Sequence, residues 1–201
     1  MEKIAESGTR VPVEELRSSV ISQRLAGIIL GPVIFCITSF GEEWGWRGYL
    51  LPKLMKIMHP IAAIILSSVI WSLWHIPYIL AGLNYGMDYE GYPYLGILVM
   101  TLFCLVAGVF FSFVSIRTNS CIPAIIGHGA VNAIAAVGVY FTVDGGKLLF
   151  GPPITGLVSM IPFTITSVIL LVLLARDNTC VNVSTCDTMI EASSDGENTV
   201  G

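Results

Sequence analysis

Charged residues are scarce in this chain: of 201 residues, only 12% are Asp, Glu, Lys or Arg, while 54% are hydrophobic. A soluble domain typically carries about a quarter charged residues, so the composition excludes an ordinary soluble protein. No charged residue at all occurs in 25–41, 57–87, 91–116, 118–143 or 148–175. All but the first of these stretches reach the ~20 residues that a membrane-spanning helix needs. We therefore predict an all-α fold, a polytopic integral membrane helical bundle with about five spans, because backbone groups in lipid must be satisfied within each segment.

Several common motifs are also missing. The five cysteines form no CxxC pair, which argues against a zinc ribbon or a disulfide framework. No HExxH sequence is present, and we see no internal repeat of the kind that transporters often contain. The net charge of −4 comes largely from the termini and implies no nucleic-acid partner. The N-terminus lacks the positive start, apolar core and small-residue cleavage site of a signal peptide.

The charge-free stretches divide the chain into three parts. Residues 1–24 are predicted to be a polar segment that includes an amphipathic helix over 12–24. Residues 25–176 form the membrane-embedded domain, and 177–201 form a polar tail that we predict to be disordered. The predicted spans run from about Leu25 to Phe40, from Pro60 to near Pro77, from Tyr94 to Ile116, from Pro123 through Asn132, and over 153–175.

The charges that do occur near the spans gather in Gly41-Glu42-Glu43-Trp44-Gly45-Trp46-Arg47. A charged side chain at bilayer depth costs roughly 2.5–3.5 kcal/mol on insertion scales, so such a cluster is rarely placed there without a function. On a helix, Glu43 and Arg47 lie four residues apart on one face and can pair. Glu42 lies about 100° further round the helix, so it cannot easily share that arginine. A solvated loop at the headgroup level is the alternative explanation for the cluster.

Two of the three histidines lie within apolar stretches. His75 follows Trp71 by four residues in the second predicted span, and His128 precedes Asn132 by four residues in the fourth. A single histidine of this kind is more often an ordinary core residue. Two of them, together with two intramembrane glutamates, favour a shared polar site, and Trp71 could form a wall of it, although ordinary packing is its commoner role. His59 lies beside Pro60 in a predicted loop, where we expect it to be solvated.

These side chains suggest general-base hydrolysis. A glutamate in a low-dielectric pocket is a competent base for a water molecule, and a histidine can orient that water or protonate a leaving amine. A second histidine and an asparagine amide can donate hydrogen bonds to the oxyanion of a tetrahedral intermediate. Two histidines and a glutamate can also bind zinc, and buried carboxylates can relay protons in a transporter.

Three motifs in this order carry a resemblance to a known family. They are Glu42-Glu43-Trp44-Gly45-Trp46-Arg47, which fits EExxxR, Trp71 to His75, an aromatic residue followed by xxxH, and His128 to Asn132, which fits HxxxN. Together they resemble the CAAX-protease and bacteriocin-processing (Abi) family of intramembrane glutamate endopeptidases, over roughly residues 25–145. The chain departs from that family in having Trp71 where phenylalanine is commoner, and in being short.

The resemblance implies a role for each matched residue. Glu42 would be the base and His75 would act on the catalytic water. His128 and Asn132 would form the oxyanion site, and Glu43 and Arg47 the supporting pair.

The prediction is therefore an intramembrane endopeptidase that hydrolyses peptide bonds near the membrane interface, with 25–176 as its protease-like domain. The alternative is a non-proteolytic membrane scaffold or bacteriocin immunity protein of the same fold. We expect no cofactor and no metal. The expected partners are a peptide or prenylated protein substrate and the lipid bilayer, with no nucleic acid, and the expected location is the cell membrane, as a multi-pass protein.

Overall fold

A computed structural model describes residues 22, 29–31, 33–135, 138 and 147–176. The regular structure in this part of the chain is helical and contains no strand, which confirms the predicted all-α fold. Residues 33–43 are helical. The elements that follow are η2 (Trp44–Leu50), α2 (Leu51–Met55), α3 (Pro60–Trp74), α4 (Ile76–Leu80), α5 (Tyr94–Thr118), α6 (Ile122–Ile134) and α7 (Ile161–Arg176).

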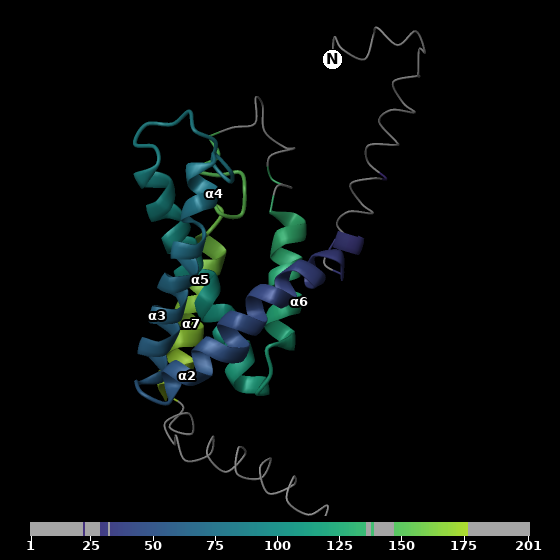
Figure 1. Cartoon of the computed structure of the whole chain (residues 1–201), viewed down its shortest axis with the longest axis vertical. Helices are drawn as coiled ribbons and strands as arrows, with labels where there is room; N and C mark the ends of the chain where they lie inside the picture. The colour runs from purple at the N-terminus through teal and green to yellow at the C-terminus, as the bar shows by residue number, and fades with distance from the viewer. Residues whose placement is uncertain (1–21, 23–28, 32, 136–137, 139–146, 177–201) are drawn as a thin grey trace, which may run out of the picture.

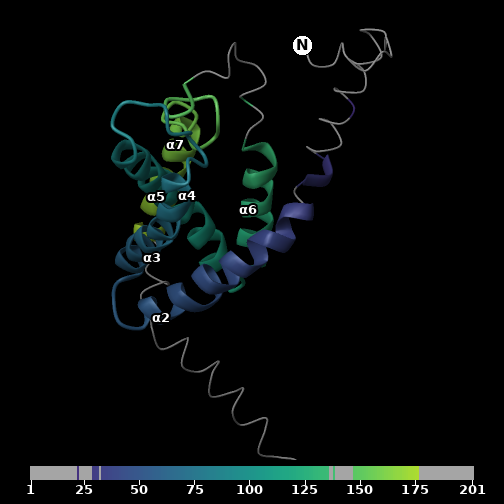
Figure 2. The same cartoon turned by 45° about the horizontal axis from the view of Figure 1, so that its top comes forward.

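Residues 33–55, called here the motif helix, form one continuous helical segment that carries the glutamates. It runs obliquely to α5 and α6 and ends at α2 (Figures 1 and 2). Its middle part, η2, is a π-helix, a wider turn that the apolar pattern of the sequence does not predict. Such π-helical turns occur frequently at functional sites. The glutamates lie immediately before it, at the junction between the two helix types.

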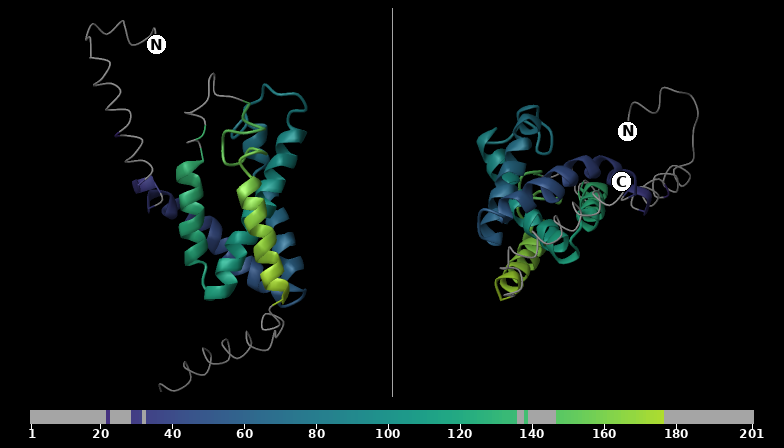
Figure 3. Two further views of the ribbon diagram at one scale, coloured as in Figure 1. Left: turned by 180° about the vertical axis from the view of Figure 1, so that it is seen from behind. Right: turned by 60° about the horizontal axis from the view of Figure 1, so that its bottom comes forward.

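Helix α5 is the central packing element, because α3, α6 and α7 all contact it. Seen from behind, α7 lies along α5 and α6 stands apart from α7 (Figure 3). The main core forms where α3, α5 and α6 meet, and it contains both large and small side chains, among them Trp71, Met100, Phe103, Ala107, Phe111 and Ala124. This close packing holds the C-terminal end of α3 and the middle of α6 near each other, which brings the two site histidines together.

The second and third predicted spans are confirmed as long apolar helices. Pro60–Leu80 and Tyr94–Thr118 are long and apolar enough to cross a membrane, and Ile122–Ile134 and Ile161–Arg176 are shorter apolar helices. The second span breaks at His75, two residues before Pro77, because a proline has no N–H to donate to the preceding turn. The predicted first span lies partly outside the described residues. The N-terminal segment 1–24, apart from residue 22, and the whole tail 177–201 also lie outside them.

The fifth predicted span begins later than hydropathy suggests. The charge-free stretch predicts a helix from 153, but residues 147–160 form turns and α7 starts at Ile161. Glycine and proline in Gly151-Pro152-Pro153 and Gly156 disfavour a helix there, and charge-free composition does not reveal this. The turn segment is nevertheless packed: Leu149 and Met160 are buried, and the Ile154 N–H donates to the Ala135 carbonyl.

Many large apolar side chains point away from the core, which suits contact with lipid. They include Leu73 on α3, Leu98 on α5 and Ile126 on α6, and the helices also expose Ile37, Trp44, Leu102, Val168 and Ile169. Extensive exposed apolar surface marks a membrane or partner contact rather than a water-facing surface. The composition of the helix faces therefore agrees with a membrane protein.

The contact between α3 and α5 depends on a glycine. A Cβ at Gly108 would collide with the Ser68 side chain and lie 3.3 Å from Nη2 of Arg47. We expect Gly108→Ala to lower the free energy of unfolding by about 1–3 kcal/mol, the usual effect of overpacking, measured as a lower thermal midpoint in detergent. Gly41→Ala is the matched control, because a Cβ there meets nothing within 4 Å. Equal midpoints for both variants would contradict the tight α3–α5 contact.

Candidate active site

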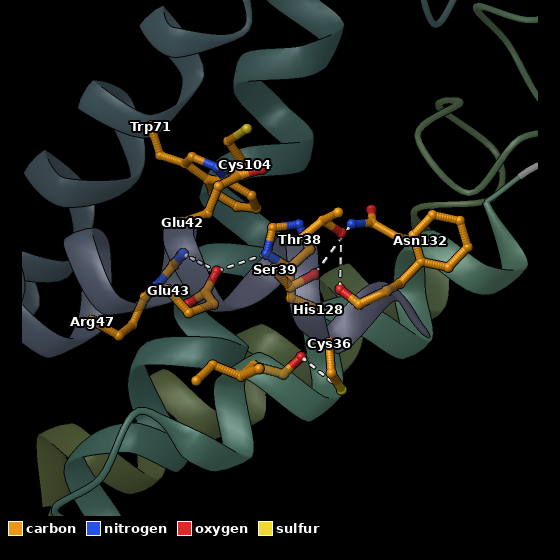
Figure 4. A network of polar contacts seen from close by, with 12 residues as sticks. Cys36, Thr38, Ser39, Glu42, Glu43, Arg47, Trp71, Cys104, His128 and Asn132 are labelled. Atoms are coloured by element: carbon orange, nitrogen blue, oxygen red, sulfur yellow. Dashed lines mark hydrogen bonds and ion pairs between the residues drawn. The ribbon is translucent and has the colours of Figure 1, made fainter. Parts of the chain in front are cut away.

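The six predicted site residues come from three parts of the fold that meet at one place. Glu42, Glu43 and Arg47 lie on the motif helix. His75 lies between α3 and α4, and α6 contributes His128 and Asn132. Figure 4 shows most of this constellation together with Trp71 of α3.

Glu43 is the centre of a buried charged cluster. Its Oε1 atom accepts a hydrogen bond from Nη1 of Arg47 at 2.8 Å and another from Nδ1 of His128 at 2.8 Å (Figure 4). Glu43 is 0% exposed, Arg47 3% and His128 5%. The pair expected from the i,i+4 spacing is therefore present, with a histidine from a distant helix added to it. A buried pair of this kind is costly to disrupt, because removing one partner leaves an uncompensated charge.

The Arg47 guanidinium lies over two aromatic rings. Its Cζ atom is 4.6 Å from the centre of the Trp71 ring and 5.3 Å from that of Phe111. Nε and Nη2 of Arg47 and Oε2 of Glu43 are buried without a hydrogen-bond partner among the described residues. A cation over aromatic faces is attracted by the ring quadrupoles, which offsets part of the loss of hydration.

The hydrogen bond to Glu43 fixes the proton position on His128. A carboxylate can only accept, so Nδ1 of His128 must carry the hydrogen. The imidazole stacks on Phe111 with ring centres 5.5 Å apart and meets Trp71 edge-on at 5.4 Å. These contacts set the plane of the ring and leave Nε2 as the nitrogen with which His128 can act.

Glu42 has a different environment from its neighbour. It is half-buried, and its Oε2 atom accepts a hydrogen bond of 3.0 Å from the indole Nε1 of Trp71. Among the described residues, Oε1 of Glu42 has no hydrogen-bond donor. Glu42 also lines an open groove of about 480 Å³, called here the Glu42 groove, whose walls are Gly41, Glu42, Gly45, Trp46, Tyr49, Leu50, Ile70 and Trp74. One oxygen of Glu42 is therefore held by Trp71, and the residue forms part of the wall of an open groove.

His75 is oriented by the backbone of the helix that it ends. Its Nδ1 atom lies 3.0 Å from the carbonyl oxygen of Trp71 and 3.8 Å from Sγ of Cys104. Because a carbonyl only accepts, Nδ1 carries the hydrogen and Nε2 of the neutral ring keeps its lone pair. The Trp71 and His75 rings meet edge-to-face with centres 5.5 Å apart.

Asn132 lies one turn after His128 on α6, on the same side of the helix. Its Nδ2 atom donates to Oγ of Ser39 on the motif helix at 3.4 Å, a long hydrogen bond (Figure 4). An amide nitrogen has two hydrogens, so Asn132 retains a second donor. Sequence reasoning missed Ser39, although it precedes Glu43 by four residues and so shares its face of the helix.

The remaining predictions concern His59, Trp71 and metal binding. His59 is exposed, as expected, and its Nδ1 atom accepts a hydrogen bond from the N–H of Ile61 at the start of α3.

Trp71 does more than form a wall of the site, because it contacts Glu42, Arg47, His75 and His128. Among the described residues, no group of three or more His, Cys, Asp and Glu side chains is arranged to hold a metal ion.

Comparisons with known proteins agree on one family. The model of the type II CAAX prenyl endopeptidase Rce1-like family matches residues 24–134. A curated relative, CAAX prenyl protease 2 from Methanococcus maripaludis, is 32% identical over 134 residues, which cover 59% of this chain and 49% of that protein. The chain thus spans about half the length of this relative. No solved structure matches the chain. Because the family match covers more than half of the chain and includes all three motifs, the chain belongs to the Rce1-like family of type II CAAX prenyl endopeptidases.

Proposed function

We propose that this protein is an intramembrane endopeptidase that hydrolyses peptide bonds near the membrane interface with water activated by Glu42. One observation carries the proposal. Glu42 lies beside an open groove with one carboxylate oxygen fixed by Trp71 and the other without a donor among the described residues. A base needs this arrangement, because it must be held in place and still reach a water molecule.

The first step is the attack of water on the peptide carbonyl. Glu42 takes one proton from the water molecule while the oxygen of that water bonds to the carbonyl carbon. This gives a tetrahedral intermediate with a negatively charged oxygen. The C–N bond then breaks, the carbonyl re-forms as a carboxylic acid, and a proton passes from Glu42 to the leaving nitrogen. His75 assists at Nε2, which can accept a hydrogen bond from the water and hold it for attack.

The attack of water creates an oxyanion, and we assign its stabilisation to His128 and Asn132. For Nε2 of His128 to donate, the ring must be an imidazolium, because Nδ1 already donates to Glu43. The Glu43 carboxylate accepts hydrogen bonds from both His128 and Arg47, so it attracts that charge while Arg47 holds the carboxylate in place. Glu43 and Arg47 therefore support the site without touching the substrate. A donor fixed in advance in a low-dielectric site stabilises developing charge strongly.

The family supports the proposed substrate class. The relative in Methanococcus maripaludis is named as a CAAX prenyl protease, so a peptide or a prenylated protein is the proposed substrate here. The two long apolar helices and the exposed apolar side chains support a position in the cell membrane as a multi-pass protein. The lipid bilayer is thus the second proposed partner.

A peptide library incubated with the purified protein in detergent tests the proposal. We expect cleavage at defined bonds by the wild-type protein and cleavage about 10²- to 10⁴-fold slower by Glu42→Gln. Equal rates of cleavage by the two proteins would contradict it. Specific capture of a partner by a protein that cleaves nothing would favour the alternative, a membrane scaffold or immunity protein of the same fold.

We also expect catalysis without a bound metal. A strong chelator should leave turnover unchanged, and metal analysis of active protein should find far less than one equivalent. The measurement discriminates because a catalytic zinc would activate water in place of Glu42. A stoichiometric metal whose removal abolishes cleavage, and whose return restores it, would contradict the glutamate mechanism in favour of metal-activated water.

A further inference from the structure

Trp71 contacts more of the site than any of the six predicted residues. It is only 1% exposed, and its ring lies beside the Arg47 guanidinium and the rings of His75 and His128. Two of its polar groups also make contacts within the site. The indole N–H donates to Glu42 and the main-chain carbonyl accepts from His75.

The hydrogen bond from the Trp71 indole restricts the orientation of the Glu42 carboxylate, which the position of the Glu42 backbone alone does not fix. A glutamate side chain has three rotatable bonds, and within the described residues the only hydrogen bond to its carboxylate comes from Trp71, at 3.0 Å. That donor comes from another helix, 29 residues further along the chain. Holding Oε2 restricts the plane of the carboxylate, so Oε1 is held in one orientation.

We propose that Trp71 is a positioning residue for the hydrolysis, because its indole N–H holds the Glu42 carboxylate in the orientation from which the free oxygen takes the proton of water. The inference rests on the proposed function. Trp71 acts through Glu42 and does not itself react. The main-chain carbonyl of Trp71 also accepts a hydrogen bond from Nδ1 of His75, which sets the position of the proton on that ring. One residue thus aligns the base and the histidine that share the water.

Trp71→Phe removes the indole N–H and keeps an aromatic ring at the same place. We expect kcat to fall by about 10- to 100-fold, as for the loss of one hydrogen bond to a charged group, with KM nearly unchanged. Trp44→Phe is the control, because Trp44 is an exposed indole on the motif helix outside the site. The isosteric benzothiophene analogue of tryptophan, with sulfur in place of N–H, tests the same hydrogen bond without any change in packing.

A double-mutant cycle with Glu42→Asp separates positioning from packing. The shorter carboxylate withdraws from the indole, so Trp71→Phe in that background should lower kcat by less than about threefold. An equal factor in both backgrounds, or full kcat in Trp71→Phe and in the benzothiophene protein, would overturn the positioning role while the proposed function stands. Undiminished cleavage by Glu42→Gln in the same assay would overturn the proposed function, and the role of Trp71 with it.

Discussion

Replacing Glu42 with glutamine is expected to lower kcat by about 10²- to 10⁴-fold, the usual contribution of general acid–base catalysis. The side-chain carbonyl of glutamine can still accept the indole hydrogen bond of Trp71, so the packing of the site is preserved. What is lost is the ability to take a proton. The measurement is kcat on a cleaved peptide, with the thermal midpoint in detergent as the check that the fold is intact.

Glu43→Gln is the matched comparison, because the two glutamates are adjacent and only one is fully buried. Glutamine at 43 leaves the buried Arg47 without its counter-charge, so we expect it to lower the thermal midpoint and to harm folding at least as much as turnover. If Glu42→Gln kept full activity and Glu43→Gln abolished it in a well-folded protein, the two roles would have to be exchanged.

Asn132→Ala is expected to lower kcat by about 10²- to 10³-fold, the effect of removing one oxyanion donor, with little change in KM. Its effect on stability should be small, because the hydrogen bond to Ser39 is long and such interhelical bonds contribute about 0.6 kcal/mol on average in membranes. Steady-state kinetics and thermal unfolding of the same preparation give both quantities. Equal turnover in wild type and Asn132→Ala would remove the oxyanion assignment.

Two further single variants and one double variant make the assignment more specific. Ser39→Ala removes the same interhelical hydrogen bond from its other end, so it should match the small change in stability while turnover falls far less. His128→Ala should lower kcat as Asn132→Ala does, and in addition lower stability because it is buried against Glu43. The double variant of His128 and Asn132 should lose much less than the product of the two effects, since both donors serve one oxyanion.

Local physics explains what the sequence could predict. The charge-free stretches identify the apolar helices, because a helix that crosses lipid needs a minimum length without charge. The pairing of Glu43 with Arg47 follows from helical spacing, which holds whatever the rest of the fold does. The separate environment of Glu42 follows from the same geometry, because it points about 100° away from that pair. Helical spacing alone therefore distinguishes the two adjacent glutamates.

Contacts between helices were not predictable in the same way. The bond from His128 to Glu43 joins residues 85 apart, and that from Trp71 to Glu42 joins residues 29 apart. Both depend on how α3, α5 and α6 pack, which in turn depends on small residues such as Gly108 whose effect appears only when a neighbour is placed. The resemblance to the family placed His128 in the oxyanion site, but not in the charged cluster with Glu43.

The predicted helix boundaries were wrong where a charge-free composition does not correspond to a helical conformation. Residues 153–160 carry no charge, yet glycine and proline keep them in turns until Ile161. The π-helix of Trp44–Leu50 has no counterpart in an apolar pattern built on 3.6 residues per turn. It follows the two glutamates directly, so the least regular part of the motif helix adjoins the residues to which we assign the chemistry.

Activation of water by Glu42 differs from direct attack of its carboxylate on the peptide in the source of the oxygen that enters the product. A single turnover in H₂¹⁸O, with the enzyme in excess over a cleavable peptide, distinguishes the two routes. If Glu42 activates water, the water oxygen adds directly to the carbonyl, so we expect the new C-terminal carboxylate to carry one ¹⁸O atom in the first turnover, by mass spectrometry. A first-turnover product that contains only ¹⁶O, with the label found on Glu42, would show that the carboxylate attacks the peptide itself and would rule out water activation by Glu42.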